Sequence, residues 1–377
     1  MQLMKNIYTS NKSVALPTLA LIVLLAFAFA APPAHAVPNC SSAGSTGLTT
    51  LITASSGQVI KGQNIHASGC DVGIFVPPGS TNVVIMKNTI TGAGVHGIFV
   101  QDSRNVVINQ NTVTGNSAGV PAVSCDFIAP PCVNEGKAIQ LSGTSNSIVL
   151  HNIVTNDLFG GIAVTDDGAV DPGALNSGSS LPALNNLVIG NYISKVSNDC
   201  GIVLAVYNEQ LASRNMILNN QVFGSEPPFG VNPYVGQIVI ATDGPNAAIQ
   251  DTIVFGNTII GSTLPGIVVH ANVPGDSISG TIIKQNVLGN NGYYPSFFSS
   301  PNTPVASDGP TGIALEAEAY GQLAAPTISG TTLVHNTIGS DTIGVWLCQT
   351  TGTTLNHTPD KGSKVVTAVA TCASGGS

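Results

Sequence analysis

The sequence predicts an all-β solenoid, a parallel β-helix in which short strands stack coil upon coil. An 11-residue motif occurs twice, as NVVIMKNTITG at residues 82–92 and NVVINQNTVTG at 105–115, with a period of 23 residues. An Asn and a Gly-Ile segment then recur along the chain in the same order. Self-similarity at a period of 20–50 residues is typical of solenoids, so this repeat predicts the fold class.

The two recurring columns have nine members each. The first is an Asn beside short apolar segments: Asn64, Asn88, Asn111, Asn152, Asn191, Asn220, Asn257, Asn286 and Asn336. The second is an apolar segment, usually after Gly, at residues 73–76, 97–100, 138–141, 161–164, 201–204, 237–240, 266–269, 312–315 and 344–347. An Asn at the same turn of every coil can stack as a hydrogen-bonded ladder.

Each repeat predicts three strands. In the first copy, one strand precedes the Asn (residues 83–86), one follows it (89–91), and the third is the Gly-Ile segment (97–100). β-Branched residues with alternating polarity favour strands, and Gly and Asn favour the turns between them. The chain is therefore expected to form about nine to ten coils, and nine coils make a rod of roughly 43 Å at about 4.8 Å per coil.

These columns resemble the β-helix repeat of the pectin-lyase-like superfamily, over about residues 57–347. The resemblance implies a right-handed parallel β-helix with three strands per coil. It implies little about function, because that superfamily holds lyases, glycosidases, epimerases, phage tailspikes and non-catalytic surface proteins.

The catalytic patterns of these families are not reproduced. Polygalacturonases use N-T-D, D-D, G-H-G and R-I-K in that order, but here G-V-H-G (94–97) precedes Asp166-Asp167 and no R-I-K follows. The D-P-H-D motif of alginate epimerases is absent from the sequence. Pectate lyases need a basic proton abstractor, and the two arginines, Arg104 and Arg214, sit at turns where a surface role suffices.

The order of segments along the chain predicts four parts. Residues 1–36 contain Lys5 and Lys12, an apolar run and an Ala-His-Ala cleavage site, which is typical of a secretory signal peptide. A membrane anchor is the alternative, disfavoured by prolines and by the cleavage site. Residues 37–56 are expected to cap the first coil, 57–348 to form the β-helix and 349–377 to form a C-terminal tail.

Export and composition bound the partners. Charged residues are 8% of the chain, and without Lys5 and Lys12 the chain has 9 basic and 19 acidic side chains, a formal charge of −10. Such a surface excludes nucleic acid and anionic membranes as partners. After cleavage, no apolar run is long enough to span a bilayer. The expected location is therefore secreted or at the cell surface.

Seven cysteines follow the signal peptide, and export permits disulfides. Sequence alone does not fix their connectivity. The pairs we expect are Cys125–Cys132 within one loop, Cys40–Cys70 at the N-terminal end and Cys348–Cys372 at the tail. Cys200 is left over and is expected to be a buried thiol. No second pair supports a zinc site.

Three long connections, at residues 114–137, 223–236 and 289–311, concentrate aromatic residues in a chain with 5% aromatics. Loops on a rigid scaffold often bind ligands, so aromatic rings there and on the adjoining strand are candidate stacking platforms for sugars. The alternative is that they pack the loops onto the rod. The candidate substrate-binding residues are Phe99, Phe229, Tyr234, Tyr293, Tyr294, Phe297 and Phe298.

Acidic residues and a histidine follow the Gly-Ile strands at the other end. On neighbouring coils they are expected roughly 5 Å apart, and two coils apart about 10 Å. Such separations suit the paired carboxylates of glycosidases. Calcium is the alternative ligand, at Asp166 and Asp167, and ordinary solvated turn residues are the third interpretation. The candidate catalytic residues are Asp166, Asp167, Asp243, His270 and Glu316.

The strand before each Asn is apolar on both faces. Its middle residue is expected to point inward and its flanking residues outward, and an apolar surface of this length should be covered. Candidate covers are residues 166–184, residues 317–327, the tail 349–377, another copy of the chain, or a partner. The middle coils, residues 148–255, are the expected contact.

Two functions remain open from the sequence. In the first, the chain binds polysaccharide or another extended cell-surface polymer without catalysis. In the second, it is a polysaccharide lyase or glycoside hydrolase that uses the acidic column. No cofactor is expected apart from the calcium alternative. The missing motifs favour the first.

Overall fold

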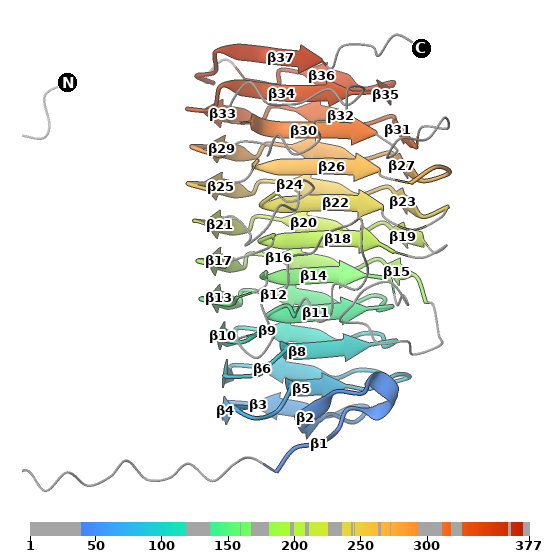
Figure 1. Ribbon diagram of the computed structural model, residues 1–377, viewed down its shortest axis with the longest axis vertical. Helices are drawn as coiled ribbons and strands as arrows, with labels where there is room; N and C mark the ends of the chain where they lie inside the picture. Colours follow the sequence, from blue (N-terminus) through green and yellow to red (C-terminus); the bar gives the residue numbers. More distant parts are fainter. Residues whose placement is uncertain are drawn as a thin grey trace, which may run out of the picture. The chain divides into compact units, whose positions relative to one another are not determined.

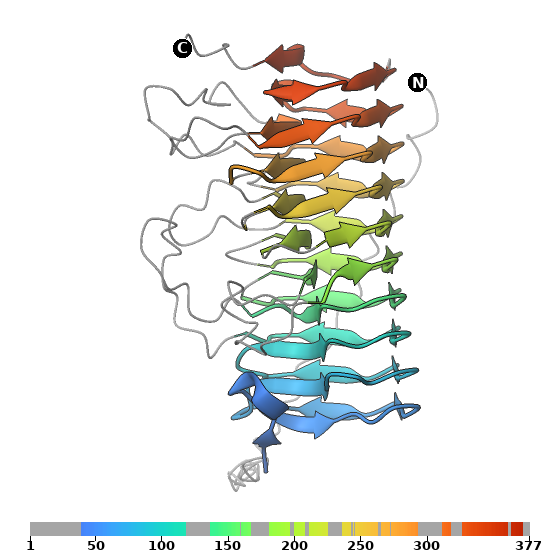
Figure 2. The ribbon, with the colours of Figure 1, turned by 90° about the vertical axis from the view of Figure 1, so that its right-hand side faces the viewer.

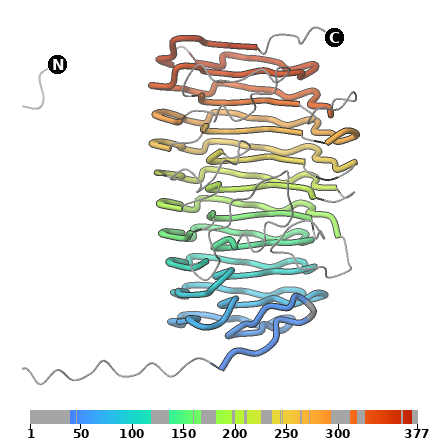
Figure 3. Tube along the Cα trace, viewed as in Figure 1, coloured from blue at the N-terminus to red at the C-terminus, as the bar shows by residue number. Residues whose placement is uncertain are grey.

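The computed structural model describes residues 39–117, 136–158, 160–166, 181–196, 200–207, 211–224, 236–242, 244, 246–262, 265–271, 273–292, 311–317, 326–360 and 363–371. Their regular structure is β, apart from the 3-10 helix η1 (Gly44–Thr46). Short strands from successive coils stack into flat parallel sheets, and the trace winds from one sheet to the next in each coil (Figures 1 and 3). The predicted right-handed parallel β-helix is confirmed.

A twelve-stranded sheet holds the Gly-Ile strands and faces the viewer in Figure 1. All of its pairings are parallel except the antiparallel pair of its first two strands. In order, it contains β1 (Ser41–Ser42), β2 (Thr49–Thr53), β5 (Val72–Val76), β8 (His96–Gln101), β11 (Ile139–Ser142), β14 (Ile162–Thr165), β18 (Ile202–Val206), β22 (Ile238–Thr242), β26 (Ile267–Ala271), β30 (Thr311–Ala317), β34 (Ile343–Cys348) and β37 (Thr367–Thr371).

A ten-stranded sheet lies behind it in the same view and holds the strands that precede each ladder Asn. Its ten strands match the predicted number of coils. They are β3 (Val59–Lys61), β6 (Val84–Met86), β9 (Val107–Asn109), β12 (Ile148–Leu150), β16 (Leu187–Ile189), β20 (Met216–Leu218), β24 (Ile253–Phe255), β28 (Ile282–Lys284), β32 (Thr332–Val334) and β36 (Thr354–Asn356).

A nine-stranded sheet follows the Asn turn, at the left of Figure 1. It contains β4 (Asn64–His66), β7 (Thr89–Thr91), β10 (Thr112–Thr114), β13 (Ile153–Thr155), β17 (Tyr192–Ser194), β21 (Gln221–Phe223), β25 (Thr258–Ile260), β29 (Val287–Gly289) and β33 (Thr337–Gly339). These three sheets are the three faces that the repeat predicts.

A fourth, six-stranded sheet runs up the right of Figure 1 and was not predicted. It contains β15 (Ala183–Leu184), β19 (Leu211–Ser213), β23 (Ala248–Gln250), β27 (Ser277–Ser279), β31 (Thr327–Ser329) and β35 (Thr350–Thr351). The middle or inward residues of the first five, such as Ala212 and Ile249, are 0% exposed. From the fifth to the ninth coil, each coil therefore buries a fourth apolar residue between the twelve-stranded and ten-stranded sheets, on the side that faces the viewer in Figure 2.

The core lies inside the coils and is built from one central side chain per short strand. In the ten-stranded sheet each strand shows a partly exposed or exposed residue on either side of a buried one, except in β36, which is exposed. The predicted inward residues are confirmed at 0–2% exposed: Ile85, Ile108, Val149, Val188, Ile217, Val254, Ile283 and Leu333. Stacked Ile, Val and Leu of neighbouring coils form one continuous apolar core.

The Asn ladder is confirmed from Asn88 to Asn336. Each Asn side-chain oxygen accepts hydrogen bonds from the backbone N and Nδ2 of the previous Asn, at 2.8–3.0 Å. The series ends on Thr358, whose Oγ1 replaces the amide. Asn64 does not belong to it, because the backbone N of Gln63 bonds to Asn88 and Asn64 is exposed.

A second ladder follows the nine-stranded sheet and mixes Asn with Asp. The backbone N of Asn116 donates to Asp157 Oδ1 at 2.9 Å, and the backbone N of Asn291 donates to Asp341 Oδ1 at 2.7 Å. Burial raises the pKa of Asp157 to about 8, against the hydrogen bonds from Asn116, which lower it. Burial also raises the pKa of Asp341, opposed by its hydrogen bonds from Asn291.

The ends of the β-helix differ from the predicted segmentation. The cap contributes β2, which pairs in parallel with β5, so the first coil begins inside residues 37–56. The tail adds β36 to the ten-stranded sheet and β37 to the twelve-stranded sheet. It extends the rod instead of folding back along it, because Thr354–Asn356 and Thr367–Thr371 satisfy the backbone groups of the terminal strands.

The disulfide Cys40–Cys70 is confirmed. Cys348 is also disulfide-bonded, while Cys372 lies outside the described residues. The predicted pair Cys125–Cys132 falls outside them as well. Cys200 is a buried thiol, as expected. The predicted signal peptide, residues 1–36, is not among the described residues, and no helix in the described part is long and apolar enough to cross a membrane.

Candidate functional site

The outer side of the twelve-stranded sheet carries an aromatic cluster at β5 and β8, near the N-terminal cap. Phe99 stacks on His96 with ring centroids 4.9 Å apart and meets Phe75 at 5.6 Å. Cap residues Ala43 and Leu48 pack into the same cluster. Phe99 is therefore 0% exposed, and its predicted role as an open sugar-stacking platform is wrong in this structure. The cap covers this end of the face because a solenoid must shield its terminal coil.

The other predicted stacking residues cannot be placed. Phe229, Tyr234, Tyr293, Tyr294, Phe297 and Phe298 all lie outside the described residues. Their role in substrate binding stays a prediction. The strands next to these connections are buried on both sides, for example throughout β18 and β22.

A polar group follows the aromatic one on the same face. Gln101, Ser142 and Thr165 occupy one register position on β8, β11 and β14. Gln140 Nε2 donates to Thr165 Oγ1 at 2.9 Å, and the hydroxyl oxygens of Ser142 and Thr165 lie 3.0 Å apart. Gln101 is 0% exposed, and its amide has no hydrogen-bond partner among the described residues. A buried amide without a partner costs stability, roughly 1–3 kcal/mol for each unsatisfied group.

His270 and Glu316 occupy the same register position farther along the sheet. They pair directly across β26 and β30, so their backbones lie about 5 Å apart. Their side chains are 1% and 6% exposed. This adjacency confirms the expected proximity of two of the five predicted catalytic residues.

Asp166 is separated from that pair. It follows β14, three strands before β26, which corresponds to about 14 Å. Its Oδ1 accepts a hydrogen bond from Tyr207 N at 2.8 Å, and it is 0% exposed. The remaining two candidates, Asp167 and Asp243, lie outside the described residues. The described candidates therefore form two separate positions on the sheet.

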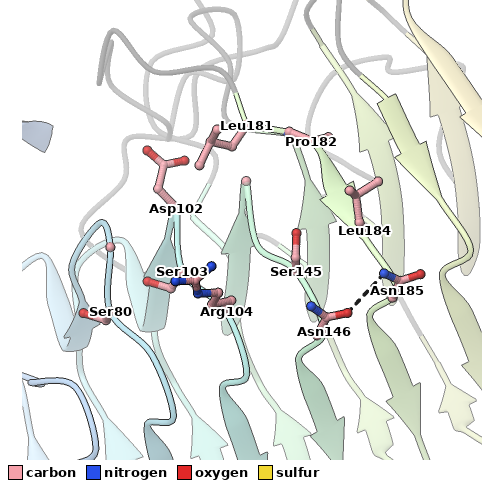
Figure 4. A pocket seen from close by; sticks show the side chains of 12 residues that line it. Ser80, Asp102, Ser103, Arg104, Ser145, Asn146, Leu181, Pro182, Leu184 and Asn185 are labelled. Carbon is pink, nitrogen blue, oxygen red and sulfur yellow. Dashed lines mark hydrogen bonds between the residues drawn. The ribbon is translucent and has the colours of Figure 1, made fainter.

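A pocket opens where β8 and β11 end and β15 begins. We call it the edge pocket. Its volume is about 380 Å³. Its polar lining comes from Asp102, Arg104, Asn146 and Asn185, together with Ser80, Ser103 and Ser145. Figure 4 shows Arg104, Asn146 and Asn185 in a row on neighbouring coils, with Asp102, Leu181 and Pro182 across the pocket from them.

Backbone geometry explains the position of the Asn side chains in this row. Asn82, Asn105, Asn146 and Asn185 all have φ between 53° and 58°, in the left-handed region that Asn tolerates better than most residues. Asn185 Nδ2 donates to Asn146 Oδ1 at 3.1 Å, and Arg214 Nε donates to Asn185 Oδ1 at 2.8 Å. The turn therefore presents amides outward on successive coils.

Arg104 supplies the positive charge of the edge pocket. Its backbone is held by bridges to Thr81 and Ser145, which fix the guanidinium stem at the pocket wall. Asp102 is 8% exposed on the opposite side. The sequence interpretation assigned Arg104 an ordinary surface role. The Asn that recurs before β6, β9, β12 and β16 was the signal that could have located this turn.

A metal centre finds no support in the described part, where no three His, Cys, Asp or Glu side chains are grouped to hold an ion. The calcium alternative at Asp166 and Asp167 stays a prediction, because Asp167 is not described.

Comparison with known proteins supports the fold. Residues 34–172 match a family model described as a right handed beta helix region. No curated protein is significantly similar in sequence.

Several solved structures are similar in architecture at low identity. A surface adhesin of Streptococcus pneumoniae, PfbA, is 12% identical, with 84% of each chain covered and a TM-score of 0.39. A family 28 exopolygalacturonase of Yersinia enterocolitica is 12% identical over 79% of this chain and 47% of its own, with a TM-score of 0.43. The catalytic domain of a GH87 α-1,3-glucanase is 12% identical over 86% of this chain and 55% of its own, with a TM-score of 0.38.

Proposed function

We propose that this protein is exported and binds a polysaccharide or another extended cell-surface polymer without catalysis, using the edge pocket as its primary subsite. The supporting observation is the lining of that pocket. The amides of Asn146 and Asn185, the guanidinium of Arg104 and the carboxylate of Asp102 converge on one cavity beside the apolar Leu181 and Pro182. Binding sites commonly combine a few fixed polar groups with an apolar wall.

The chemistry of this lining fits a sugar chain. Amide groups both donate to and accept from hydroxyls, the carboxylate accepts, and the guanidinium donates. Leu181 and Pro182 offer an apolar surface to the C–H side of a sugar ring. Because the polar row crosses three coils, it runs along the rod and suits a ligand that extends beyond one sugar unit.

Binding to a panel of neutral and acidic polysaccharides, measured by calorimetry, tests this function. Arg104→Ala and Asn146→Ala should each weaken binding by roughly three- to tenfold, since one lost hydrogen bond is worth about 0.5–1.5 kcal/mol. Asn219→Ala is the matched control, because Asn219 has a similar left-handed backbone (φ 51°) but lies at another turn. Equal effects of all three substitutions would remove the edge pocket from the proposal.

The second candidate is a lyase or glycosidase, and the pairing of His270 with Glu316 favours it. A buried imidazole beside a carboxyl group is a common acid–base arrangement. Reducing-end and unsaturated-product assays, each with and without calcium, decide between the candidates. Products that disappear in Glu316→Gln would establish catalysis, whereas binding without products in the native protein supports the proposed function.

A further inference from the structure

The outer surface of the ten-stranded sheet, which we call the A face, is not covered by the described residues. It consists of the first and third side chains of each strand, which are partly exposed or exposed along the whole sheet. Val59, Met216 and Ile282 reach 57%, 38% and 38% exposure. The tail was a predicted cover, but its strands β36 and β37 extend the rod instead.

The A face is apolar over most of its length. The first residues of the ten strands are apolar in the first eight: Val59, Val84, Val107, Ile148, Leu187, Met216, Ile253 and Ile282, before Thr332 and Thr354. A regular apolar strip of this kind, bordered by the polar left-handed turns on either side, has the composition of a protein interface core with a polar rim.

The third residues follow a symmetric pattern. In strand order they are Lys61, Met86, Asn109, Leu150, Ile189, Leu218, Phe255, Lys284, Val334 and Asn356. The polar members stand at the first, third, eighth and tenth strands, and these positions mirror each other about the midpoint between β16 and β20. Reversing the strand order therefore leaves the polar and apolar positions unchanged.

We propose that the A face binds the A face of a second copy of this chain, with the two rods antiparallel and a two-fold axis between β16 and β20. That axis runs along the strand direction, so it places third residues opposite third residues and each strand opposite its mirror strand. Apolar third residues then meet apolar third residues, including Ile189 with Leu218 of the other copy. An isologous contact of this kind requires one self-complementary surface.

The polar positions carry the specificity of this contact. The third strand faces the eighth, so Asn109 of each copy meets Lys284 of the other. Asn109 is partly exposed, but its Oδ1 is screened from solvent and has no hydrogen-bond partner among the described residues. The Lys284 ammonium is a donor, and it reaches this oxygen once the Asn109 amide rotates toward the other copy. The contact forms twice because of the symmetry. Within one chain the two residues lie five strands apart, about 24 Å, so they cannot satisfy each other.

The matching repeat favours a second copy over an unrelated partner. Side chains on the A face recur at the strand spacing of about 4.8 Å along the rod, and another copy presents the same spacing for interdigitation. The strip is about 43 Å long and about 10 Å wide, which gives roughly 400 Å² per copy as a flat area. A typical stable complex buries about 800 Å² per partner, so this contact belongs to the class of weak, transient interfaces.

Sedimentation of the purified protein between about 1 and 100 μM tests the proposal. The native chain should change from monomer to dimer across this range. Asn109→Asp should tighten association several-fold at low salt through its contact with Lys284, and salt should remove the gain. Asn109→Lys should weaken association, because it places like charges opposite each other.

A charge exchange gives the sharpest result. Adding Lys284→Asp to Asn109→Lys restores opposite charges across the interface only if the rods are antiparallel as proposed, and it should rescue the dimer. Thr112→Asp and Thr112→Lys on the nine-stranded sheet are matched controls, and they should leave association unchanged. A monomer at every concentration, including with Asn109→Asp, overturns the proposal. The proposal is also overturned if the Asn109 substitutions leave dimerisation unchanged, or if the charge exchange does not restore it.

Discussion

Asp157 is a buried carboxyl group in a ladder otherwise suited to amides, and replacing it with Asn tests how the coils are held together. It is 1% exposed, and burial raises its pKa from 3.8 to about 8. Its Oδ1 accepts the backbone hydrogen bond of Asn116, while Oδ2 has no hydrogen-bond partner among the described residues. The folded protein therefore keeps this carboxyl protonated at neutral pH.

The sign of the pH dependence follows from that shift. The unfolded chain releases this proton near pH 3.8, and the folded chain holds it to about pH 8. Between these values the folded state binds more protons, so the free energy of unfolding falls as pH rises. The stabilisation is fully present below pH 3.8 and lost above about pH 8. At 1.36 kcal/mol per pH unit, the loss is at most about 6 kcal/mol.

Asp157→Asn removes the titration and retains the acceptor. The amide Oδ1 can still accept from Asn116 N, as the ladder amides do elsewhere, for example Asn191 with Asn152. We expect the variant to match the native protein below about pH 4 and to exceed its stability increasingly as the pH rises, by a few kcal/mol more near pH 9 than near pH 5. Urea unfolding followed by far-UV circular dichroism at several pH values measures the difference.

Asp251→Asn is the matched control, because Asp251 is exposed at a turn of the ten-stranded sheet. Its profile should parallel that of the native protein. If the difference between Asp157→Asn and the native chain stays constant from pH 5 to pH 9, the carboxyl does not retain its proton in the folded state, and the reasoning fails.

Three further outcomes follow from the fold. Asn191→Ala removes the hydrogen bonds to Asn220 Oδ1 and Val149 O, and it leaves the buried backbone N of Asn152 without its acceptor. The free energy of unfolding should therefore fall by about 3 kcal/mol, and an unchanged urea midpoint would contradict this. Replacing both Cys40 and Cys70 with Ser opens a loop spanning 30 residues, which should cost about 3–4 kcal/mol and make the cap the first segment cut by protease. Leu218→Asp should abolish dimerisation while leaving the circular dichroism spectrum unchanged, whereas loss of the folded spectrum would show that the side chain stabilises the monomer.

The fold was predictable because every coil must meet the same two requirements, hydrogen bonds for the backbone at its turn and an apolar residue for the core. Asn88 and its successors satisfy backbone groups at a turn, and the Ile or Val three residues earlier fills the core. Where the repeat was atypical, the prediction failed. The first coil has Gln63 at the ladder position, and alignment on Asn64 shifted it by one residue.

The fourth sheet was missed for a related reason. Its strands are two or three residues long and lie in a connection whose length varies between coils, so no constant period reveals them. Ala183, Ala212 and Ile249 nevertheless point inward and are fully buried. An apolar residue two positions before a left-handed residue (Asn185, Arg214 or Asp251) was the available signal.

The candidate site was predictable in part, because strand register can be counted from the sequence whereas the burial of a side chain depends on the folded cap and connections. The sequence placed His270 and Glu316 together, since strand counting alone fixes their pairing. It could not show that Phe99 is buried in a cluster that includes Ala43 and Leu48, because that cluster depends on how the cap folds over the face. The edge pocket likewise depends on Leu181 and Pro182, which follow a long connection.

The distribution of charge explains where function can reside on such a rod. Equivalent side chains on neighbouring coils stand about 4.8 Å apart, so a charge repeated in one column would repel its neighbours. The chain has 8% charged residues, and its faces carry them singly, as at Lys284, or as neighbours that can attract, as at His270 and Glu316. Positions where a charge interrupts an otherwise uniform column therefore mark specific contacts rather than scaffold. We propose the A face and the edge pocket as separate contact surfaces, and substitutions in one should leave binding at the other intact.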